Sequence, residues 1–153
     1  MAGTLAGIAR HALPMGPMET LARVAVTAAE GVHGDFRGAQ ASTKPSRRRQ
    51  VSLIEADSVT AALAEAGATL AWSDCRRNLL VQGLRLPREE GLRVQIGGTL
   101  VLEITCECEP CERMDALHSG LRAALTPDWR GGFLGRVIED GEIAVGDEIR
   151  ILP

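Results

Sequence analysis

Residues 92–105, Leu92-Arg93-Val94-Gln95-Ile96-Gly97-Gly98-Thr99-Leu100-Val101-Leu102-Glu103-Ile104-Thr105, carry the clearest fold signal in this chain. Apolar and polar side chains alternate from Leu92 to Ile96, which is typical of a half-buried strand, and Gly97-Gly98 is a two-residue hairpin signal. The run from Thr99 to Thr105 is apolar and rich in β-branched residues, and it predicts a second strand. The stretch therefore predicts a β-hairpin.

Short apolar runs on both sides of this hairpin predict further strands. They lie at residues 5–11, 21–28, 50–54 and 79–81, and Gly131-Gly132 opens a final hairpin with apolar side chains at Val137, Ile143, Val145, Ile149 and Ile151. We expect seven or eight short strands and no βαβ alternation. The pattern predicts a mainly β, barrel-like domain with about two helices, and it argues against a doubly wound sheet.

The two helices are expected after the third of these strands and after the central hairpin. Asp57 or Ser58 can cap a helix that runs to about Ala66 and ends at Gly67. A second helix is predicted over residues 112–125, where apolar side chains recur at steps of three and four: Met114, Leu117, Leu121 and Leu125. Pro110 suits the start of this helix, because its missing N–H costs nothing in a first turn.

Length and composition indicate one soluble globular domain over residues 1–153. The chain is 45% apolar and 24% charged, and its 17 basic and 20 acidic residues give a net charge of −3. This charge offers no case for nucleic acid or a membrane as partner, and no apolar run approaches the roughly 20 residues of a spanning helix. The first residues lack the pattern of a secretory signal, so we expect a cytoplasmic protein.

The four cysteines are Cys75, Cys106, Cys108 and Cys111, and their clustering argues against a disulfide framework. Cys108-Glu109-Pro110-Cys111 lies where the strand leads into the second helix. Cys111 would then lie at a positive helix end, which favours a thiolate that acts as nucleophile, sulfur carrier or soft metal ligand. A zinc site, a redox pair and a buried structural thiol (chiefly Cys106) remain as alternatives.

Two basic segments are candidates for binding an anion. Arg76-Arg77-Asn78 combines two guanidinium groups with an amide, and these groups suit phosphate or carboxylate oxygens. Residues 44–49, Lys44-Pro45-Ser46-Arg47-Arg48-Arg49, close a polar stretch that begins at Asp35 and predicts a long, mobile loop. Composition alone favours solvated loop charges over anion binding for both segments. Gly34-Asp35 indicates a turn before any function.

These pieces, in this order, resemble the MOSC domain, the family named for the C-terminal domain of molybdenum cofactor sulfurases. The matching residues run through nearly the whole chain: Gly31-x-x-Gly34-Asp35, Arg49-Gln50-Val51-Ser52-Leu53-Ile54, Arg76-Arg77-Asn78-Leu79, Gly83-x-x-Leu86, Gly97, Cys108-x-Pro110-Cys111, Gly131-Gly132 and Gly141-x-Ile143-x-x-Gly146-Asp147. The length resembles that of stand-alone bacterial members.

The resemblance implies a β-barrel and a function in molybdenum cofactor chemistry. Cys111 matches the position that carries sulfur, as a persulfide, or ligates molybdenum, and is thus the expected catalytic and metal-binding residue. The residues expected to bind the anionic pterin cofactor, molybdopterin, are Gly34, Asp35, Arg49, Arg76, Arg77 and Asn78. Pyridoxal phosphate is not expected. Members that hold the cofactor reduce N-hydroxylated compounds with electrons from a separate protein, so an electron donor or a cofactor-biosynthesis protein is the implied partner.

The alternative is a non-catalytic interaction module in molybdenum cofactor biosynthesis, in which the barrel is retained without the chemistry. A zinc-stabilised binding module is a weaker third interpretation. Cys111 distinguishes the first two, because the alternative expects partner binding and cellular cofactor levels to survive Cys111→Ser, and stoichiometric zinc would indicate the third.

Overall fold

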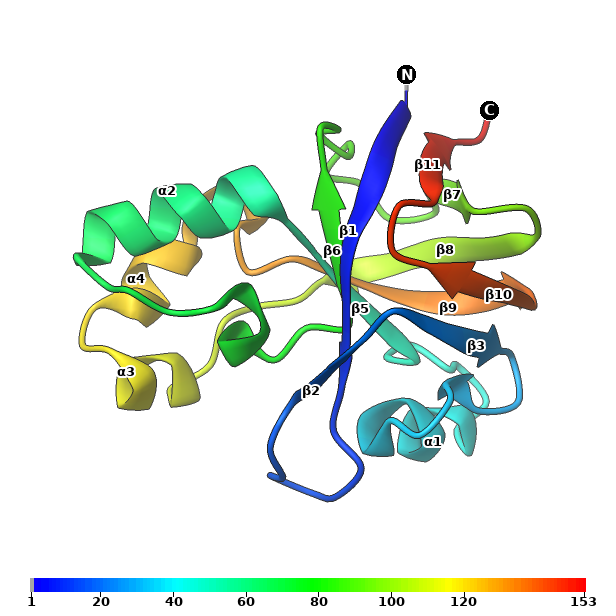
Figure 1. Cartoon of the computed structure of the whole chain (residues 1–153), viewed down its shortest axis with the longest axis horizontal. Coiled ribbons are helices and arrows are strands. Elements are labelled where there is room, and N and C mark those ends of the chain that lie inside the picture. Colours follow the sequence, from blue (N-terminus) through cyan, green and yellow to red (C-terminus); the bar gives the residue numbers. More distant parts are fainter. Residues whose placement is uncertain (1) are drawn as a thin grey trace.

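Seven strands close into a β-barrel in the computed structural model, which describes residues 2–153 (Figure 1). In order around the barrel they are β11 (Glu148–Ile151), β7 (Arg93–Ile96), β8 (Leu100–Glu107), β9 (Phe133–Glu139), β5 (Val51–Glu55), β6 (Leu79–Gln82) and β1 (Ala2–Arg10). The pairing of Ala2 with Arg150 joins β1 to β11, closes the ring and places the two chain ends side by side. The predicted mainly β, barrel-like fold is confirmed.

Four shorter strands complete the eleven found in residues 2–153. β2 (Glu19–Leu21) pairs with the end of β1, while β10 (Gly141–Ala144), β3 (Arg23–Thr27) and β4 (Gly31–Val32) form a separate three-stranded sheet. The count exceeds the seven or eight predicted because the run at residues 21–28 is divided between β2 and β3, and because β4 lies outside every predicted run. The final hairpin likewise becomes β9, β10 and β11, and Val145 lies exposed between the last two.

The interior of the barrel holds the main core, and the central hairpin supplies much of it. Ile96 pairs with Leu100 across residues 97–99, so the predicted β7–β8 hairpin is confirmed. Alternate side chains of the two strands point inward and are fully buried, as the two-residue period requires. These inward residues are Val94, Ile96, Leu100, Leu102 and Ile104.

A second apolar cluster lies on the outer face of β5 and β6, under helices α2 (Ala56–Ala66) and α4 (Leu121–Leu125) (Figure 1). Ile54 and Leu80 point out of the barrel into this cluster, and Gly67 ends α2 in the left-handed conformation, as predicted. Because β5 and β6 are parallel and α2 connects them, the chain contains one βαβ unit. The prediction of no βαβ alternation is wrong at this point.

The predicted helix over residues 112–125 is two short helices, α3 (Arg113–Leu117) and α4. His118 is extended and Gly120 has a φ of 89°, which ends the first helix and starts the second. Three of the four predicted apolar side chains are buried, but Leu117 is 42% exposed. The break turns the face that carries Leu117 away from the core.

Helix α1 (Phe36–Ser42) occupies part of the stretch that was predicted to be a long loop. Its buried residues are Gly38 and Ala41, so the helix has no apolar stripe that a sequence pattern could reveal. Two 3-10 turns, η1 (Trp72–Cys75) and η2 (Pro127–Trp129), complete the helical elements of the described chain. None of the helices in residues 2–153 has the length and apolar character needed to span a membrane.

Candidate functional site

Of the four cysteines, all of which lie in the described part of the chain, Cys111 is the exposed one. It follows β8 in a segment held against the barrel by two contacts. The Cys108 N–H donates to the Gly132 carbonyl at 2.8 Å. Gly131 allows Pro110 to approach, because a Cβ there would lie 2.9 Å from the proline Cδ. These contacts bury Cys108 and Pro110 and leave the Cys111 side chain at the surface.

Cys111 lies outside helix α3, which corrects the expectation that it occupies a helix start. The helix begins at Arg113, has Glu112 as its N-cap and is five residues long, so Pro110 lies before its first turn. The Cys111 carbonyl accepts a hydrogen bond from the Met114 N–H at 3.0 Å. The surroundings of the thiol are therefore set by side chains rather than by a helix end.

Two small adjoining hollows, of about 50 and 20 Å³, bring most of the predicted site residues together. Four side chains line both of them: His11, Arg37, Arg49 and Arg76. The first hollow also contains Cys111, Met114 and two more arginines, Arg77 and Arg113, and the second also contains Asp35, Ser52 and Asn78. We call the five arginines the arginine basin: Arg37, Arg49, Arg76, Arg77 and Arg113.

The arginine basin carries positive charge without a matching set of carboxylates. Within residues 2–153, none of its five guanidinium groups forms an ion pair. Partial burial and then the charges of Arg49 and Arg113 lower the pKa of Arg37 below its usual value. Partial burial, followed by Arg113 and Arg37, lowers the pKa of Arg76. Like charges held this close favour the binding of an anion.

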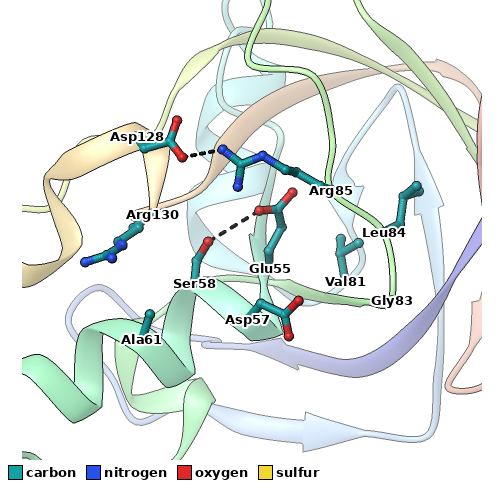
Figure 2. Close-up of a pocket in the computed structure, with 10 residues that line it drawn as sticks. All are labelled: Glu55, Asp57, Ser58, Ala61, Val81, Gly83, Leu84, Arg85, Asp128 and Arg130. Atoms are coloured by element: carbon teal, nitrogen blue, oxygen red, sulfur yellow. Dashed lines mark hydrogen bonds and ion pairs between the residues drawn. The ribbon is translucent and has the colours of Figure 1, made fainter.

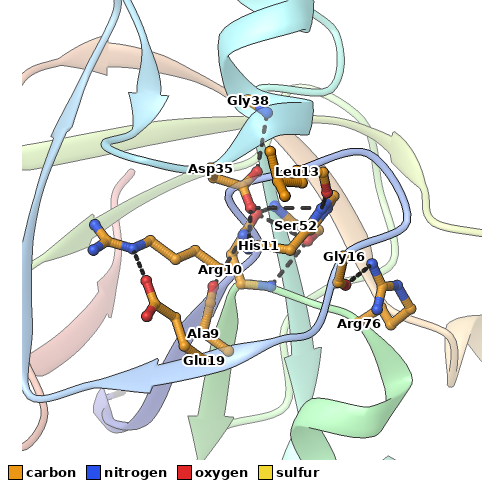
Figure 3. A network of polar contacts seen from close by, with 11 residues as sticks. Ala9, Arg10, His11, Leu13, Gly16, Glu19, Asp35, Gly38, Ser52 and Arg76 are labelled. Carbon is orange, nitrogen blue, oxygen red and sulfur yellow. Dashed lines mark hydrogen bonds and ion pairs between the residues drawn. The ribbon is translucent and has the colours of Figure 1, made fainter.

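Asp35 fixes the start of α1 through its side chain, which points toward Gly38 of that helix (Figure 3). Its carboxylate is 2% exposed and accepts hydrogen bonds from the N–H groups of Gly38 at 3.0 Å and His11 at 3.1 Å. The first of these bonds makes Asp35 the N-cap of α1, which places Arg37 in the first turn. Gly34 lines neither hollow, and a Cβ at this position would meet the Arg10 guanidinium at 2.7 Å.

His11 lines both hollows and has one ring nitrogen committed to the backbone. Its Nδ1 lies 2.8 Å from the Leu13 carbonyl oxygen, so Nδ1 carries the proton and donates (Figure 3). Its Nε2 lies 4.0 Å from Oδ1 of Asp35. The imidazole therefore has a fixed orientation at the edge of the basin.

Arg76 and Arg77, two of the predicted site residues, differ in how many of their side-chain N–H groups already donate hydrogen bonds within the protein. Arg76, in the left-handed conformation, donates one bond, from Nη2 to the Gly16 carbonyl at 2.9 Å (Figure 3). Arg77 is buried and donates from Nε to the Gly131 carbonyl and from Nη1 to the Cys75 carbonyl. Arg76 therefore has more free donors for a ligand than Arg77.

Asn78 ties three barrel strands together. Its Oδ1 accepts from the N–H of Ser52 at 3.0 Å and from the Ser52 hydroxyl at 3.1 Å, and its Nδ2 donates to the Ala9 carbonyl at 3.1 Å. These bonds connect β6 to β5 and β1 directly below the basin. The amide is therefore part of the framework of the site, and contact with a ligand stays a prediction.

A wider hollow of about 760 Å³ adjoins the first small hollow, because Cys111 and Arg49 line both of these two. Its wall contains Trp129, Pro110 and a second thiol, Cys106, whose Sγ accepts a hydrogen bond from Arg48 Nε at 3.3 Å. Burial, and then the charge of Glu109, raise the pKa of Glu107 on the same wall. The exposed thiol thus lies between a small basic recess and a hollow large enough for an organic ligand.

A separate pocket of about 220 Å³ lies between α2, η2 and the residues that follow β6 (Figure 2). It is polar, and most of its charges are paired. Arg85 binds Asp128, and Glu55 accepts a bond from the Ser58 hydroxyl at 3.3 Å. Glu55 also forms a 2.7 Å ion pair with Arg88. This paired network stabilises the junction of β5 and α2, and of the charged lining residues Asp57 alone has no ion-pair partner among the described residues.

Among the described residues, no three side chains of the types His, Cys, Asp or Glu come together as a metal-binding set. The zinc interpretation therefore has no donor set in residues 2–153. Cys108 is 1% exposed and, together with Cys106 and Leu134, forms a small apolar cluster, which fits the structural interpretation of these two thiols.

A family model of the MOSC domain matches residues 22–150. The chain belongs to the MOSC domain family. No curated protein matches the chain in sequence. YuaD from Bacillus subtilis has a similar structure, with 18% identity and a TM-score of 0.77 over 97% of this chain and 94% of that one. YiiM from Geobacillus stearothermophilus (15% identity, TM-score 0.68, covering 98% and 74%) and YiiM from Escherichia coli (14%, 0.70, covering 100% and 70%) share the fold.

The MOSC barrel adds three site residues that the sequence did not single out. His11 comes from the end of β1, Arg37 from the first turn of α1 and Arg113 from the start of α3. The one local signal that could have pointed to Arg37 is Asp35, a residue type that caps helices, although the residues after it show no apolar stripe. His11 and Arg113 carry no local signal, because only the folded chain brings them together.

Proposed function

We propose that this MOSC domain binds the molybdenum cofactor, with the Cys111 thiolate as a protein ligand to molybdenum or as the carrier of a persulfide sulfur. The observation that carries the proposal is the position of Cys111. It is an accessible thiol that shares one recess with the arginine basin, and the same thiol opens onto the wide hollow.

The residues present fit such a group in three respects. A thiolate is a soft ligand, which suits molybdenum or a bound sulfur atom. The guanidinium groups of Arg37, Arg49 and Arg76 suit the phosphate of the pterin, because they are planar donors with no carboxylate partner in the described chain. The hollow of about 760 Å³ leaves room for the rest of the ligand.

When bound, this cofactor would supply the two-electron redox chemistry that MOSC members apply to N-hydroxylated compounds. The residues of this chain would bind and orient it. Asp35 and Asn78 hold the strands and α1 in place, and the arginine basin neutralises the phosphate. We further propose that electrons come from a separate protein.

The test is the metal, pterin and persulfide content of the protein, purified from cells that make the cofactor. We expect molybdenum and pterin in near-equal amounts in the native protein, or a persulfide on Cys111 by mass spectrometry. Cys111→Ala should lose the signal, whereas Cys75→Ala, which changes a buried thiol outside the site, should retain it. Arg76→Gln should lower the pterin content, and Arg23→Gln, an exposed arginine on β3, should not.

The result that overturns the proposal is the absence of molybdenum, pterin and persulfide from the native protein. A signal that survives in Cys111→Ala would overturn the role of the thiol and leave the cofactor in place. Molybdenum with pterin identifies the ligand role of Cys111, and a persulfide without either identifies the carrier role.

A further inference from the structure

A third hollow, of about 290 Å³, lies on α1 and the loop that follows this helix. Its lining contains no carboxylate and four cationic side chains, which are Arg37, Lys44, Arg48 and Arg49. In residues 2–153 none of the four forms an ion pair, although acidic residues outnumber basic ones by 20 to 17 in the whole chain. We call it the outer basic hollow, and its positive charge is available to a partner.

The loop over residues 44–49 is held against the barrel. The Arg47 guanidinium donates to the Val137 carbonyl of β9 at 2.9 Å. The Thr105 hydroxyl of β8 donates to the Arg48 carbonyl at 2.6 Å. The cations of the outer basic hollow therefore project from an ordered backbone, so a partner that binds them need not order the loop first.

Two exposed apolar side chains lie in the loop between β1 and β2. Leu13 is 66% exposed and Met15 is 68% exposed, the two highest values among the exposed large apolar residues of the described chain. We call this pair the apolar rim. Two residues that line the small hollows hold its loop: Nδ1 of His11 donates to the Leu13 carbonyl at 2.8 Å, and Nη2 of Arg76 donates to the Gly16 carbonyl at 2.9 Å (Figure 3). Exposed apolar side chains on a fixed loop, methionine among them, are typical of a protein contact.

The recess that contains Cys111 is bordered by both features. Arg37 and Arg49 line the outer basic hollow as well as the two small hollows. His11 and Arg76, which hold the loop of the apolar rim, also line both small hollows. Cations and apolar side chains thus form one face around the recess, and a protein that covers this face reaches the surroundings of the thiol.

We propose that this face docks a small acidic electron-carrier protein, whose carboxylates contact the outer basic hollow and whose apolar surface contacts the rim. The inference rests on the proposed function for the partner's task, electron delivery, and it adds the docking surface and the charge of that partner. A few charges around a small apolar contact suit a carrier that must leave after each transfer, and opposite charge speeds its encounter.

The net charge of the chain favours a compact acidic partner over an extended anionic surface. The whole chain carries −3, so a membrane or a long polyanion would be repelled by the remainder of the molecule. A carrier with a local cluster of carboxylates contacts only the basic face. Lys44 is the most useful residue to change, because it lines the outer basic hollow and neither small hollow.

The experiment titrates the full chain with two carriers of opposite charge by calorimetry. One is a plant-type ferredoxin, an acidic iron–sulfur carrier, and the other is cytochrome c, a basic carrier. The salt concentrations are about 20 mM and about 200 mM, where the screening length is roughly 20 Å and roughly 7 Å. We expect ferredoxin to bind at low salt, its affinity to fall about tenfold or more at the higher salt, and cytochrome c not to bind.

Three variants with exposed side chains separate the two parts of the face. Lys44→Glu should weaken ferredoxin about fivefold at low salt, because one charge contact is reversed. Met15→Ser should weaken it about fivefold at both salt concentrations, because an apolar contact is lost. Arg150→Glu makes the same charge change as Lys44→Glu on β11, well away from α1, and should leave the affinity nearly unchanged (Figure 1). Thermal unfolding confirms that each variant is folded.

Three results of the titrations would overturn the inference: no binding of ferredoxin at low salt, equal binding of cytochrome c, or an affinity that Lys44→Glu and Met15→Ser leave intact. Two further measurements test other occupants of the face. Tighter binding to phosphatidylglycerol vesicles than to ferredoxin would assign it to a membrane. A dimer in sedimentation that Met15→Ser dissociates would assign it to a second copy of the chain, and either result also overturns the inference.

The docking face and the proposed function fail separately. Ferredoxin binding by a protein that contains no molybdenum, pterin or persulfide refutes the proposed function alone. Molybdenum and pterin in a native protein that does not bind ferredoxin refute the docking face alone.

Discussion

Arg37 occupies a position where its charge opposes the stability of the fold. It is the second residue of α1, so its cation lies at the positive end of the helix, and Arg49 and Arg113 are close enough to lower its pKa after partial burial. Its side chain forms no hydrogen bond or ion pair in residues 2–153. Arg37→Gln therefore removes repulsion and loses no specific contact, and glutamine has nearly the helix propensity of arginine.

We expect Arg37→Gln to stabilise the protein by about 0.5–1 kcal/mol at low ionic strength, since an unfavourable charge near a helix end costs roughly 0.3–1 kcal/mol. The repulsion from the other arginines acts in the same direction. Solvent screens it, because the Arg37 side chain is largely exposed, so the expected gain in stability stays within this range. For a chain of this length, the gain corresponds to a melting temperature about 1–4 °C higher.

The assay is thermal unfolding in a buffer of low salt that contains no phosphate or sulfate. Near 1 M salt, where the screening length is only about 3 Å, the two proteins should melt together. With inorganic phosphate added, the order should reverse, because the native protein binds the anion more tightly and gains stability from it. A lower melting temperature for Arg37→Gln at low salt, or a difference that salt does not change, would refute the reasoning, and Arg23→Gln serves as the matched control.

Two further changes test the framework of the site. Arg88→Met leaves the Glu55 carboxylate, whose side chain is 5% exposed, without its ion-pair partner. The free energy of unfolding, measured in urea, should fall by about 3–5 kcal/mol. A loss below about 1 kcal/mol, or no recovery of stability in the double variant with Glu55→Gln, contradicts the buried pair. Glu107→Gln should raise the melting temperature near pH 7 but not near pH 4: burial, and then Glu109, raise the pKa of Glu107, so stability that its neutral form provides is lost as pH rises above the usual value of 4.5. A native protein more stable than the variant at pH 7 would contradict this sign.

The strands of the barrel were predictable because their side chains alternate over a buried interior. The β7–β8 hairpin and the end of α2 at Gly67 follow from local patterns that the folded protein retains, whereas the predicted cap is wrong: Asp57 and Ser58 lie inside the helix, whose N-cap is Glu55. Helix α1 was not predictable in this way, because the residues it buries are glycine and alanine. The parallel pairing of β5 with β6 also has no local signal, since it depends on which strand α2 returns to.

The site shows the same division between local and long-range information. Arg76, Arg77 and Asn78 are adjacent in sequence, and the folded chain brings two of them and Cys111 to one recess. It also distinguishes what the sequence could not: the polar atoms of Asn78 are used by β1 and β5, whereas Arg49 forms no contact of this kind in the described chain. The order of motifs could predict the family. Whether a given residue supports the framework or is free to contact a ligand depends on the hydrogen bonds of the folded barrel.

The arginine basin persists although its charges repel, because rigid parts of the protein hold three of its arginines separately. Arg76 is tied to the Gly16 carbonyl, Arg77 to the Gly131 and Cys75 carbonyls, and Arg37 to a helix whose cap is Asp35. None of these bonds neutralises charge, so the repulsion remains until an anion enters. Binding of an anion would then relieve the repulsion between the arginines. The repulsion therefore increases the affinity for an anion and lowers the stability of the free protein. Under the proposed function, Cys111 would receive its ligand in a site that is ordered beforehand and whose positive charge is neutralised only when the ligand is bound.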